Sequence, residues 1–223
     1  RPYQGCEPTR QTVMQAPRPD LSSRVCADGV ASPLATLARL PSVGLGTSFY
    51  PEDLRGAEPL PPTGTREYAA QQNAQTERAV LFAIEHGYRL IDTANGYSNQ
   101  RAVGVAIERA IERGLVYRKE LIVVCKIPAR QLVSADSVRE GVQQALERLR
   151  LSYVDVLMAH APPVPAACWR EMEAAVRSGQ ARALGVSNFD KNAGRRELSK
   201  LLASATVPPV VAQFERCVLV QSV

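Results

Sequence analysis

Polar side chains that can donate, accept or hold a proton follow successive short apolar runs along this 223-residue chain. In chain order they belong to Asp92 and Tyr97, Lys126, His160, Ser187 and Asn188, and Gln213, and an earlier run ends at Gly46 and Thr47.

The first four of these side chains make a set suited to proton transfer. A phenol has a pKa of about 10, which a nearby ammonium group lowers because it stabilises the phenolate. A carboxylate keeps the ammonium charged, and an imidazole orients a carbonyl oxygen or shares the transfer. We therefore expect Asp92, Tyr97, Lys126 and His160 to suit carbonyl reduction, in which hydride reaches the carbon while Tyr97 protonates the oxygen.

The remaining side chains suit a ligand that carries an amide group, because Asn and Gln both donate and accept hydrogen bonds. Each also has a structural explanation. Ser187 and Asn188 could cap the start of a helix, and Gln213 could satisfy backbone groups next to its strand. Taken alone, Tyr97 would suit a packing position and His160 a hydrogen-bonded core position. Only their ordered occurrence together favours a shared site.

The elements that must position these residues alternate between strand and helix. Apolar residues recurring on one helix face, followed by C-cap glycines such as Gly87 and Gly114, predict the helices; Ser134 is a predicted N-cap. The expected helices span 76–86, 99–113, 134–149, 166–178 and 191–203, and the expected strands span 41–47, 88–92, 121–126, 154–159, 183–186 and 210–214.

Near-continuous apolar strands between helices predict a parallel sheet that is buried on both faces. In such α/β folds, active sites form at the carboxyl ends of the strands, where the polar residues above lie. Alternation alone does not choose between a β/α barrel and an open doubly wound sheet. At most six βα units fit before Val223.

Several segments resemble the aldo-keto reductase family, in the family's order. The resemblance begins at GLGT (44–47) and LIDTANGYSNQRAVGVAI (90–107) and continues through ELIVVCK (120–126), DVLMAH (155–160), ALGVSNF (183–189) and VAQFE (211–215). The spacings also fit: 29 residues separate Tyr97 from Lys126, and 34 separate Lys126 from His160. The glycines at 44 and 46 are not a dinucleotide-binding fingerprint.

The resemblance implies a role for each residue. Asp92, Tyr97, Lys126 and His160 would form the catalytic tetrad, with Tyr97 as the general acid. The cofactor would be NADPH, with NADH left open, and the substrate a small carbonyl compound. The nicotinamide carboxamide would be held by Ser187, Asn188 and Gln213, and Asp92, Gly46 and Thr47 would also lie at the cofactor.

The resemblance also implies a fold, a (β/α)8 barrel, of which this chain would hold about six units. The last two βα units, which in the family carry the basic residues that bind the 2′-phosphate of the cofactor, would follow Val223. The sequence departs from the family pattern at Gln100 and Ala161, and only 28 residues separate His160 from Asn188. We therefore keep two alternatives to an active reductase, namely a non-catalytic binding or regulatory module of the same fold and an inactive fragment.

Composition assigns the remaining segments. Residues 1–38 are rich in Pro, Arg, Ser and Thr, and we expect them to form a poorly ordered extension. The barrel domain is expected to follow at residues 39–223, with a long loop at residues 51–74.

Charge, histidine content, hydropathy and cysteine content argue against several classes of protein. A net charge of +5 without a dense basic tract, with 5% aromatic residues, argues against nucleic-acid binding. Two histidines exclude a multi-histidine metal site, and no apolar stretch is long enough to span a membrane. Five cysteines without a CxxC pair fit a reducing compartment, so we expect a cytoplasmic protein; a longer amino end would leave organelle targeting open.

Overall fold

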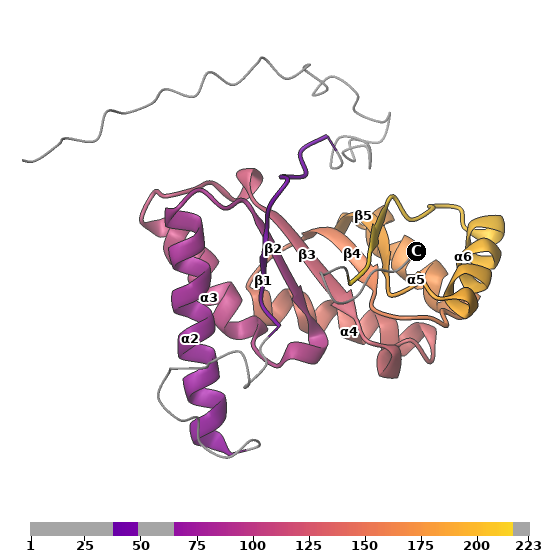
Figure 1. The fold of residues 1–223 in the computed structure, drawn as a ribbon, viewed down its shortest axis with the longest axis horizontal. Coiled ribbons are helices and arrows are strands. Elements are labelled where there is room, and N and C mark those ends of the chain that lie inside the picture. Colours follow the sequence, from indigo (N-terminus) through magenta and orange to yellow (C-terminus); the bar gives the residue numbers. More distant parts are fainter. Residues whose placement is uncertain (1–37, 49–64, 216–223) are drawn as a thin grey trace, which may run out of the picture.

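A computed structural model describes residues 38–48 and 65–215 of the chain. It contains a curved sheet of six parallel strands with helices packed around its outside (Figure 1). The strands are β1 (Leu45–Gly46), β2 (Leu90–Ala94), β3 (Ile122–Ile127), β4 (Val154–Ala159), β5 (Ala181–Ser187) and β6 (Val211–Gln213). The helices are α2 (Arg66–Glu85), α3 (Gln100–Glu112), α4 (Ala135–Leu149), α5 (Ala166–Arg177) and α6 (Asn192–Ser204).

The strand order decides between the two architectures that the sequence left open. The order is sequential, β1-β2-β3-β4-β5-β6, and every neighbouring pair is parallel. A doubly wound sheet reverses its order at a switch point, whereas a barrel adds each strand next to the previous one. The six strands therefore form part of a barrel, as predicted.

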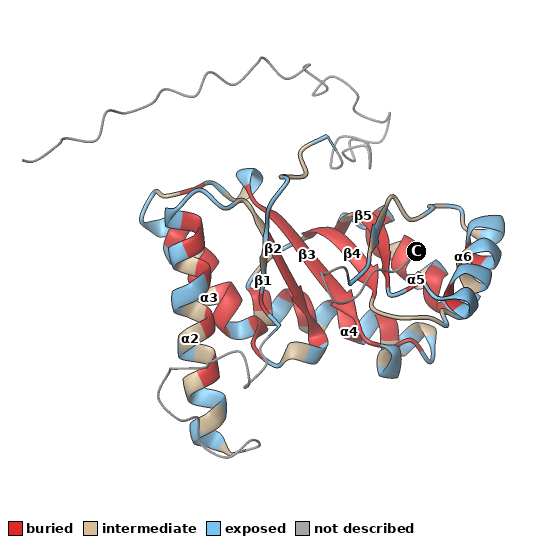
Figure 2. Ribbon diagram, viewed as in Figure 1, coloured by how far each residue is buried: buried red, intermediate tan, exposed pale blue. Residues whose placement is uncertain are grey.

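The sheet separates two sets of apolar side chains. One face of β3, with Val123, Cys125 and Ile127, packs against the helices in the main core. The opposite, concave face carries a smaller cluster, which includes Val124 and Met158. Because successive side chains alternate between faces, Asp92 and Lys126 belong to the concave face. Figure 2 shows that strands β2 to β5 and the sheet-facing sides of the helices are buried, whereas β1 and β6 at the two sheet edges are half-buried or exposed.

The clearest error in the sequence prediction is the start of α2. The helix begins at Arg66, so residues 66–74, predicted as loop, are helical. The segment, REYAAQQNA, consists mostly of Ala and polar residues and has no apolar periodicity to detect. The Thr65 hydroxyl nevertheless accepts a hydrogen bond from the Tyr68 N–H at 3.1 Å and caps the helix. The rest of the predicted loop and residues 1–37 lie outside the described residues.

Other boundaries differ by a few residues. β2 lies two residues later than predicted, β1 is shorter and β5 is longer. The predicted caps are confirmed, because the Ser134 side chain accepts from Ser137 N, and Gly87 and Gly114 have φ values of +89° and +69°. None of the described helices is long and apolar enough to cross a membrane.

Gly104 lets α3 and α4 approach closely. A Cβ atom at this position would lie 2.6 Å from the backbone carbonyl of Leu149 and 2.8 Å from that of Arg148. We expect Gly104→Ala to lower the free energy of unfolding by about 1–3 kcal/mol, because the overlap outweighs the roughly 1 kcal/mol by which Ala favours a helix. Urea denaturation measures this change.

Gly141→Ala in α4 is the matched control for this prediction. Its added Cβ would meet only the flexible side chain of Gln131, at 3.1 Å. An unfolding free energy for Gly104→Ala equal to or above that of Gly141→Ala would contradict the close helix contact.

Candidate active site

The predicted polar residues lie together at the carboxyl end of the sheet. Asp92 comes from β2, Lys126 from β3 and Ser187 from β5, while His160 follows β4 directly. Parallel pairing places Ala94 opposite Lys126 and Ser187 opposite Gln213. Residues that are far apart in the sequence therefore share one rim because all six strands run in the same direction.

A buried ion pair forms the base of the site. Lys126 is 2% exposed, and its Nζ pairs with Asp92 Oδ1. The other carboxylate oxygen, Oδ2, accepts a hydrogen bond from Gln213 Nε2 at 3.0 Å. Burying either charge alone would be costly, so the two side chains compensate each other. Thr47 donates from both its N–H and its hydroxyl to the Asp92 carbonyl, each at 2.9 Å, and Gly46 lies opposite Asp92 in β1.

Tyr97 lies above this ion pair. It ends a short 3-10 turn, η2 (Asn95–Tyr97), and the next residue, Ser98, has a φ of +60° that turns the chain back. The Tyr97 ring centroid is 5.3 Å from Lys126 Nζ, and 5.7 Å from the His160 ring at an interplanar angle of 78°. The phenol therefore lies between an ammonium group and an imidazole.

Hydrogen bonds fix the backbone of His160 from both sides. Its N–H donates to the Ile127 carbonyl at 3.0 Å, and its own carbonyl accepts from Asn188 Nδ2 at 2.8 Å. Partial burial lowers the pKa of His160 below 6.5, and the positive charges of Lys126 and Arg130 add to this effect while Asp92 opposes it. The imidazole is therefore neutral at pH 7.

We expect an NMR titration to give His160 a pKa below 6.5, and Arg130→Gln to raise it because one positive charge is removed. His86 is the only other histidine, so His86→Gln assigns the signals. Between the folded pKa and 6.5 the unfolded chain binds more protons, so stability falls as pH decreases through this window. A His160 pKa above 6.5 would contradict this electrostatic environment.

Asn188 joins two strand ends. It has a φ of +64°, and its Nδ2 donates to Ser187 Oγ at 3.1 Å as well as to the His160 carbonyl. The alternative role of Ser187 and Asn188 as a helix cap is wrong, because α6 begins after Lys191, which makes no side-chain cap bond. Both residues therefore remain available to line the site.

Three supporting residues were not predicted from the sequence. Asn95 Nδ2 donates to the Gly141 carbonyl at 2.8 Å, and Asn99 Nδ2 donates to the Thr47 carbonyl at 2.7 Å, so they anchor the turn that carries Tyr97. The NGYSN motif, with an asparagine two residues on each side of Tyr97, was an available signal. Arg130 acts on His160 only through space, and no sequence pattern marks it.

Behind the site, Gln100 and Cys125 form a buried polar contact. Gln100 Nε2 lies 3.3 Å from Cys125 Sγ, and burial raises the pKa of the Cys125 thiol to about 12, which keeps it protonated. Cys125 is therefore a core residue, as its apolar surroundings predicted. Within the described residues no group of His, Cys, Asp and Glu side chains could hold a metal ion.

A cavity of about 740 Å³ opens on the concave face of the sheet next to this site. Asp92 and Gln213 line one side of it, and Phe189, Arg195 and Met158 also border it. Its volume is in the range of small-molecule sites. Gln213 lines this cavity, and the side chains of Ser187 and Asn188 lie at the same end of the sheet, so this region holds hydrogen-bond donors and acceptors.

Comparisons with known proteins agree with this arrangement. The chain is 32% identical over 200 residues to "Aldo-keto reductase family 4 member C11" of Arabidopsis thaliana, covering 82% of this chain and 55% of that protein. It is 34% identical over 172 residues to NADPH-dependent codeinone reductase 1-4 of Papaver somniferum, covering 68% and 52%. The chain spans about half the length of these relatives.

A solved structure shows the same architecture. The crystal structure of Bombyx mori aldo-keto reductase AKR2E4 in complex with NADP superposes with a TM-score of 0.63 and 31% identity, covering 79% of this chain and 55% of that one. The six strands correspond to a half-barrel of this TIM-barrel fold. Residues 63–222, more than half of the chain, match the Aldo/keto reductase family, and the protein belongs to that family.

Proposed function

We propose that the full-length protein reduces an aldehyde or a ketone to an alcohol with NADPH. One observation carries this proposal: the buried Lys126–Asp92 ion pair faces Tyr97, with His160 at the edge of the same ring. This arrangement has a proton donor, a charge that stabilises the resulting anion, and a neutral hydrogen-bond donor for the substrate oxygen.

In this proposal each residue has one task. The Tyr97 hydroxyl donates its proton to the substrate oxygen, and the positive charge of Lys126 stabilises the phenolate that remains. Asp92 keeps Lys126 charged and oriented. His160, neutral at pH 7, donates a hydrogen bond that orients the carbonyl group.

The cofactor would be held by residues of the same rim. Ser187, Asn188 and Gln213 would bind the nicotinamide carboxamide, with Gly46 and Thr47 below it. NADPH, when bound, supplies the hydride. The name of the Papaver relative and the NADP in the Bombyx structure support this choice of cofactor. Gln213 would exchange its hydrogen bond to Asp92 for one to the carboxamide.

Turnover with deuterium-labelled NADPH tests the proposal. With a panel of small aldehydes and ketones, we expect NADPH oxidation and deuterium on the carbinol carbon of the product. NADH in place of NADPH tests the preference between the two nucleotides. Absence of turnover over the whole panel would refute the reductase proposal.

The alternative is a non-catalytic binding or regulatory module of the same fold, which would keep the nicotinamide site without turnover. A fluorescence titration separates the two proposals. NADPH binding without turnover favours the module, whereas turnover excludes it.

A further inference from the structure

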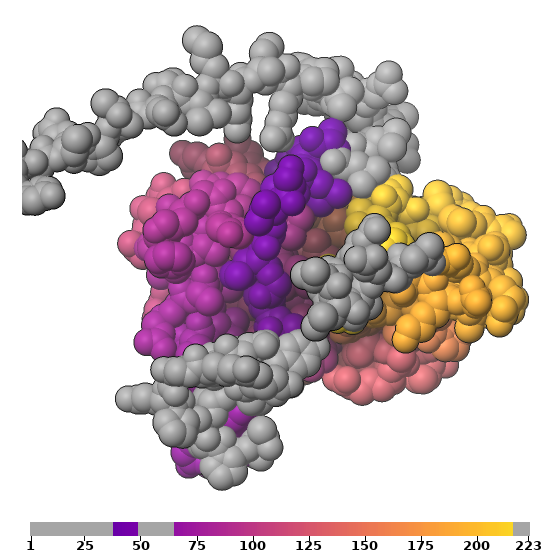
Figure 3. Space-filling view, in the orientation of Figure 1, coloured from indigo at the N-terminus to yellow at the C-terminus, as the bar shows by residue number. Residues whose placement is uncertain are grey.

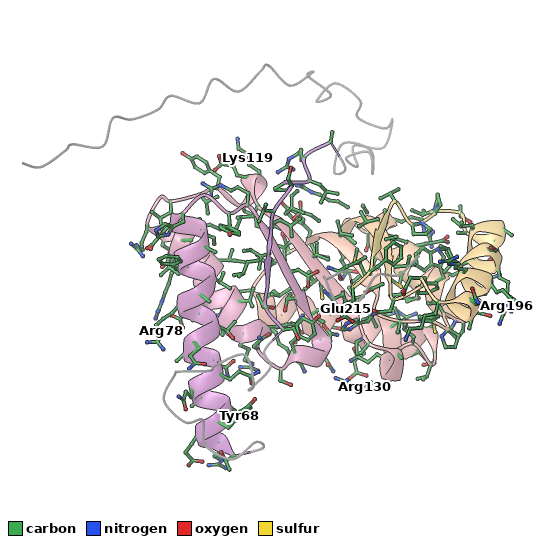
Figure 4. The ribbon with its side chains drawn as sticks, in the orientation of Figure 1. Tyr68, Arg78, Lys119, Arg130, Arg196 and Glu215 are labelled. Atoms are coloured by element: carbon green, nitrogen blue, oxygen red, sulfur yellow. The ribbon has the colours of Figure 1, made fainter. Side chains whose placement is uncertain are left out.

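We propose a second ligand site, for a small phosphate-bearing anion, at the amino ends of the strands. A cavity of about 810 Å³ lies there, and four cationic side chains line it: Arg39, Arg89, Lys119 and Arg182. This site is independent of the proposed reductase activity, because it lies at the other end of the sheet. In Figure 4, Lys119, just before β3, lies at the top of the view and Arg130, just after β3, at the bottom, on opposite sides of the sheet.

Backbone carbonyl groups hold two of these guanidinium groups in place. Arg39 donates from Nη2 to the Lys119 carbonyl. Arg89 donates from Nη1 to the carbonyls of Ile84 at 3.1 Å and Tyr88 at 2.9 Å. Such bonds orient the donors but neutralise no charge. Each guanidinium has five N–H donors, so most of them remain available to a ligand.

Carboxylates compensate little of this charge. Within residues 38–48 and 65–215, neither Arg39, Arg89 nor Lys119 forms an ion pair. Glu120 also lines the cavity, but its Oε2 accepts a hydrogen bond from the Tyr117 N–H at 2.7 Å. Four cations and one carboxylate leave a charge of +3 on the lining (4 − 1 = 3).

Arg182 connects the cavity to the folded core. Its Nη1 pairs with the buried Asp155 at 3.2 Å, and its guanidinium lies 4.0 Å from the centroid of the Tyr153 ring. Arg182 is therefore held rigidly, and its charge is the most compensated of the four. The three remaining cations supply the attraction for an anion.

The chemistry of the lining favours phosphate groups. Like charges collected in one cavity repel one another and produce a field that attracts anions. Guanidinium groups bind phosphate through two parallel hydrogen bonds, and a lysine adds a point charge. The cavity is large enough for a ligand with more than one phosphate group. Nucleic acid fits poorly because the four cations gather in one open cavity and do not form an extended stripe.

Inorganic tripolyphosphate is a suitable probe. In isothermal titration calorimetry at fixed ionic strength, we expect the wild-type protein to bind it, and Lys119→Gln and Arg39→Gln each to weaken binding about tenfold or more. The double variant should lose binding, whereas Lys119→Arg should retain it. Arg196→Gln, on exposed α6 far from Lys119 (Figure 4), is the control because it changes net charge equally.

Three outcomes would overturn the proposal. Equal weakening in Lys119→Gln and Arg196→Gln would show binding through net charge alone. Displacement of tripolyphosphate by NADPH, together with unchanged NADPH binding in Lys119→Gln, would place the anion at the cofactor site. Citrate binding as tightly as tripolyphosphate would assign the site to carboxylates. Lys119 is exposed, so Lys119→Gln should keep the wild-type melting temperature. Should the double variant fail to fold, the binding measured for Lys119→Gln alone tests the proposal.

Discussion

Tyr97→Phe is expected to lower kcat for NADPH-dependent carbonyl reduction about a thousandfold, since general acid catalysis contributes roughly 10²- to 10⁴-fold. The substitution removes only the hydroxyl group, so the ring contacts with Lys126 and His160 should persist. The Kd for NADPH should therefore change little. Stopped-flow measurement of a single turnover gives the rate of the chemical step, and a fluorescence titration gives the Kd.

Tyr88→Phe is the matched control for this prediction. Tyr88 lies before β2, at the amino end of the strands, and is 37% exposed. Removing its hydroxyl should leave kcat unchanged. If Tyr97→Phe turned over at the wild-type rate, Tyr97 would not be the proton donor, and the proposed mechanism would fail.

Asp155→Ala is expected to lower the free energy of unfolding by about 3 kcal/mol, because it leaves the half-buried Arg118 and Arg182 without their counter-ion. Asp155 is fully buried in β4. Its Oδ2 pairs with Arg118 Nη2 at 2.8 Å and accepts from the Val123 N–H at 3.0 Å, and its Oδ1 pairs with Arg182. This single carboxylate therefore links β4 to β3 and to β5, and its loss removes contacts to both neighbouring strands.

Asp136→Ala provides the comparison for Asp155→Ala. Asp136 also pairs with an arginine, Arg139, but its side chain is 89% exposed. Exposed ion pairs contribute little because water and salt screen them. Urea denaturation should show a large loss for Asp155→Ala and no measurable change for Asp136→Ala. Equal losses would mean that the buried cluster does not stabilise the sheet.

Figure 3 shows where the first strand lies on the surface of the folded chain. Residues 38–48 lie in the middle of one face, with α2 beside them (Figure 3). Leu45, Gly46 and Thr47 together with Val80 of α2 line a smaller cavity of about 350 Å³. The amino-terminal strand is attached to the fold by its pairing with β2 and by Leu45, which packs against the main core.

The sequence by itself determined the alternation of strands and helices and the position of the polar residues at strand ends. It could do so because the spacing of apolar residues along a helix or strand, and the glycines that end helices, are properties of residues close together in the chain. β4, for example, was predicted with its observed bounds, Val154–Ala159. The same local signal failed at the start of α2, where a polar helix has no apolar stripe.

Only the tertiary structure decided which residues meet. The hydrogen bond from Gln213 to Asp92 joins residues 121 apart in the chain, and it depends on how strongly the sheet curves. The Asp155 cluster and the basic cavity likewise depend on which strands are neighbours. Alternation of elements does not fix strand order, register or curvature, so the sequence could indicate which residues form the active site but not the contacts between them.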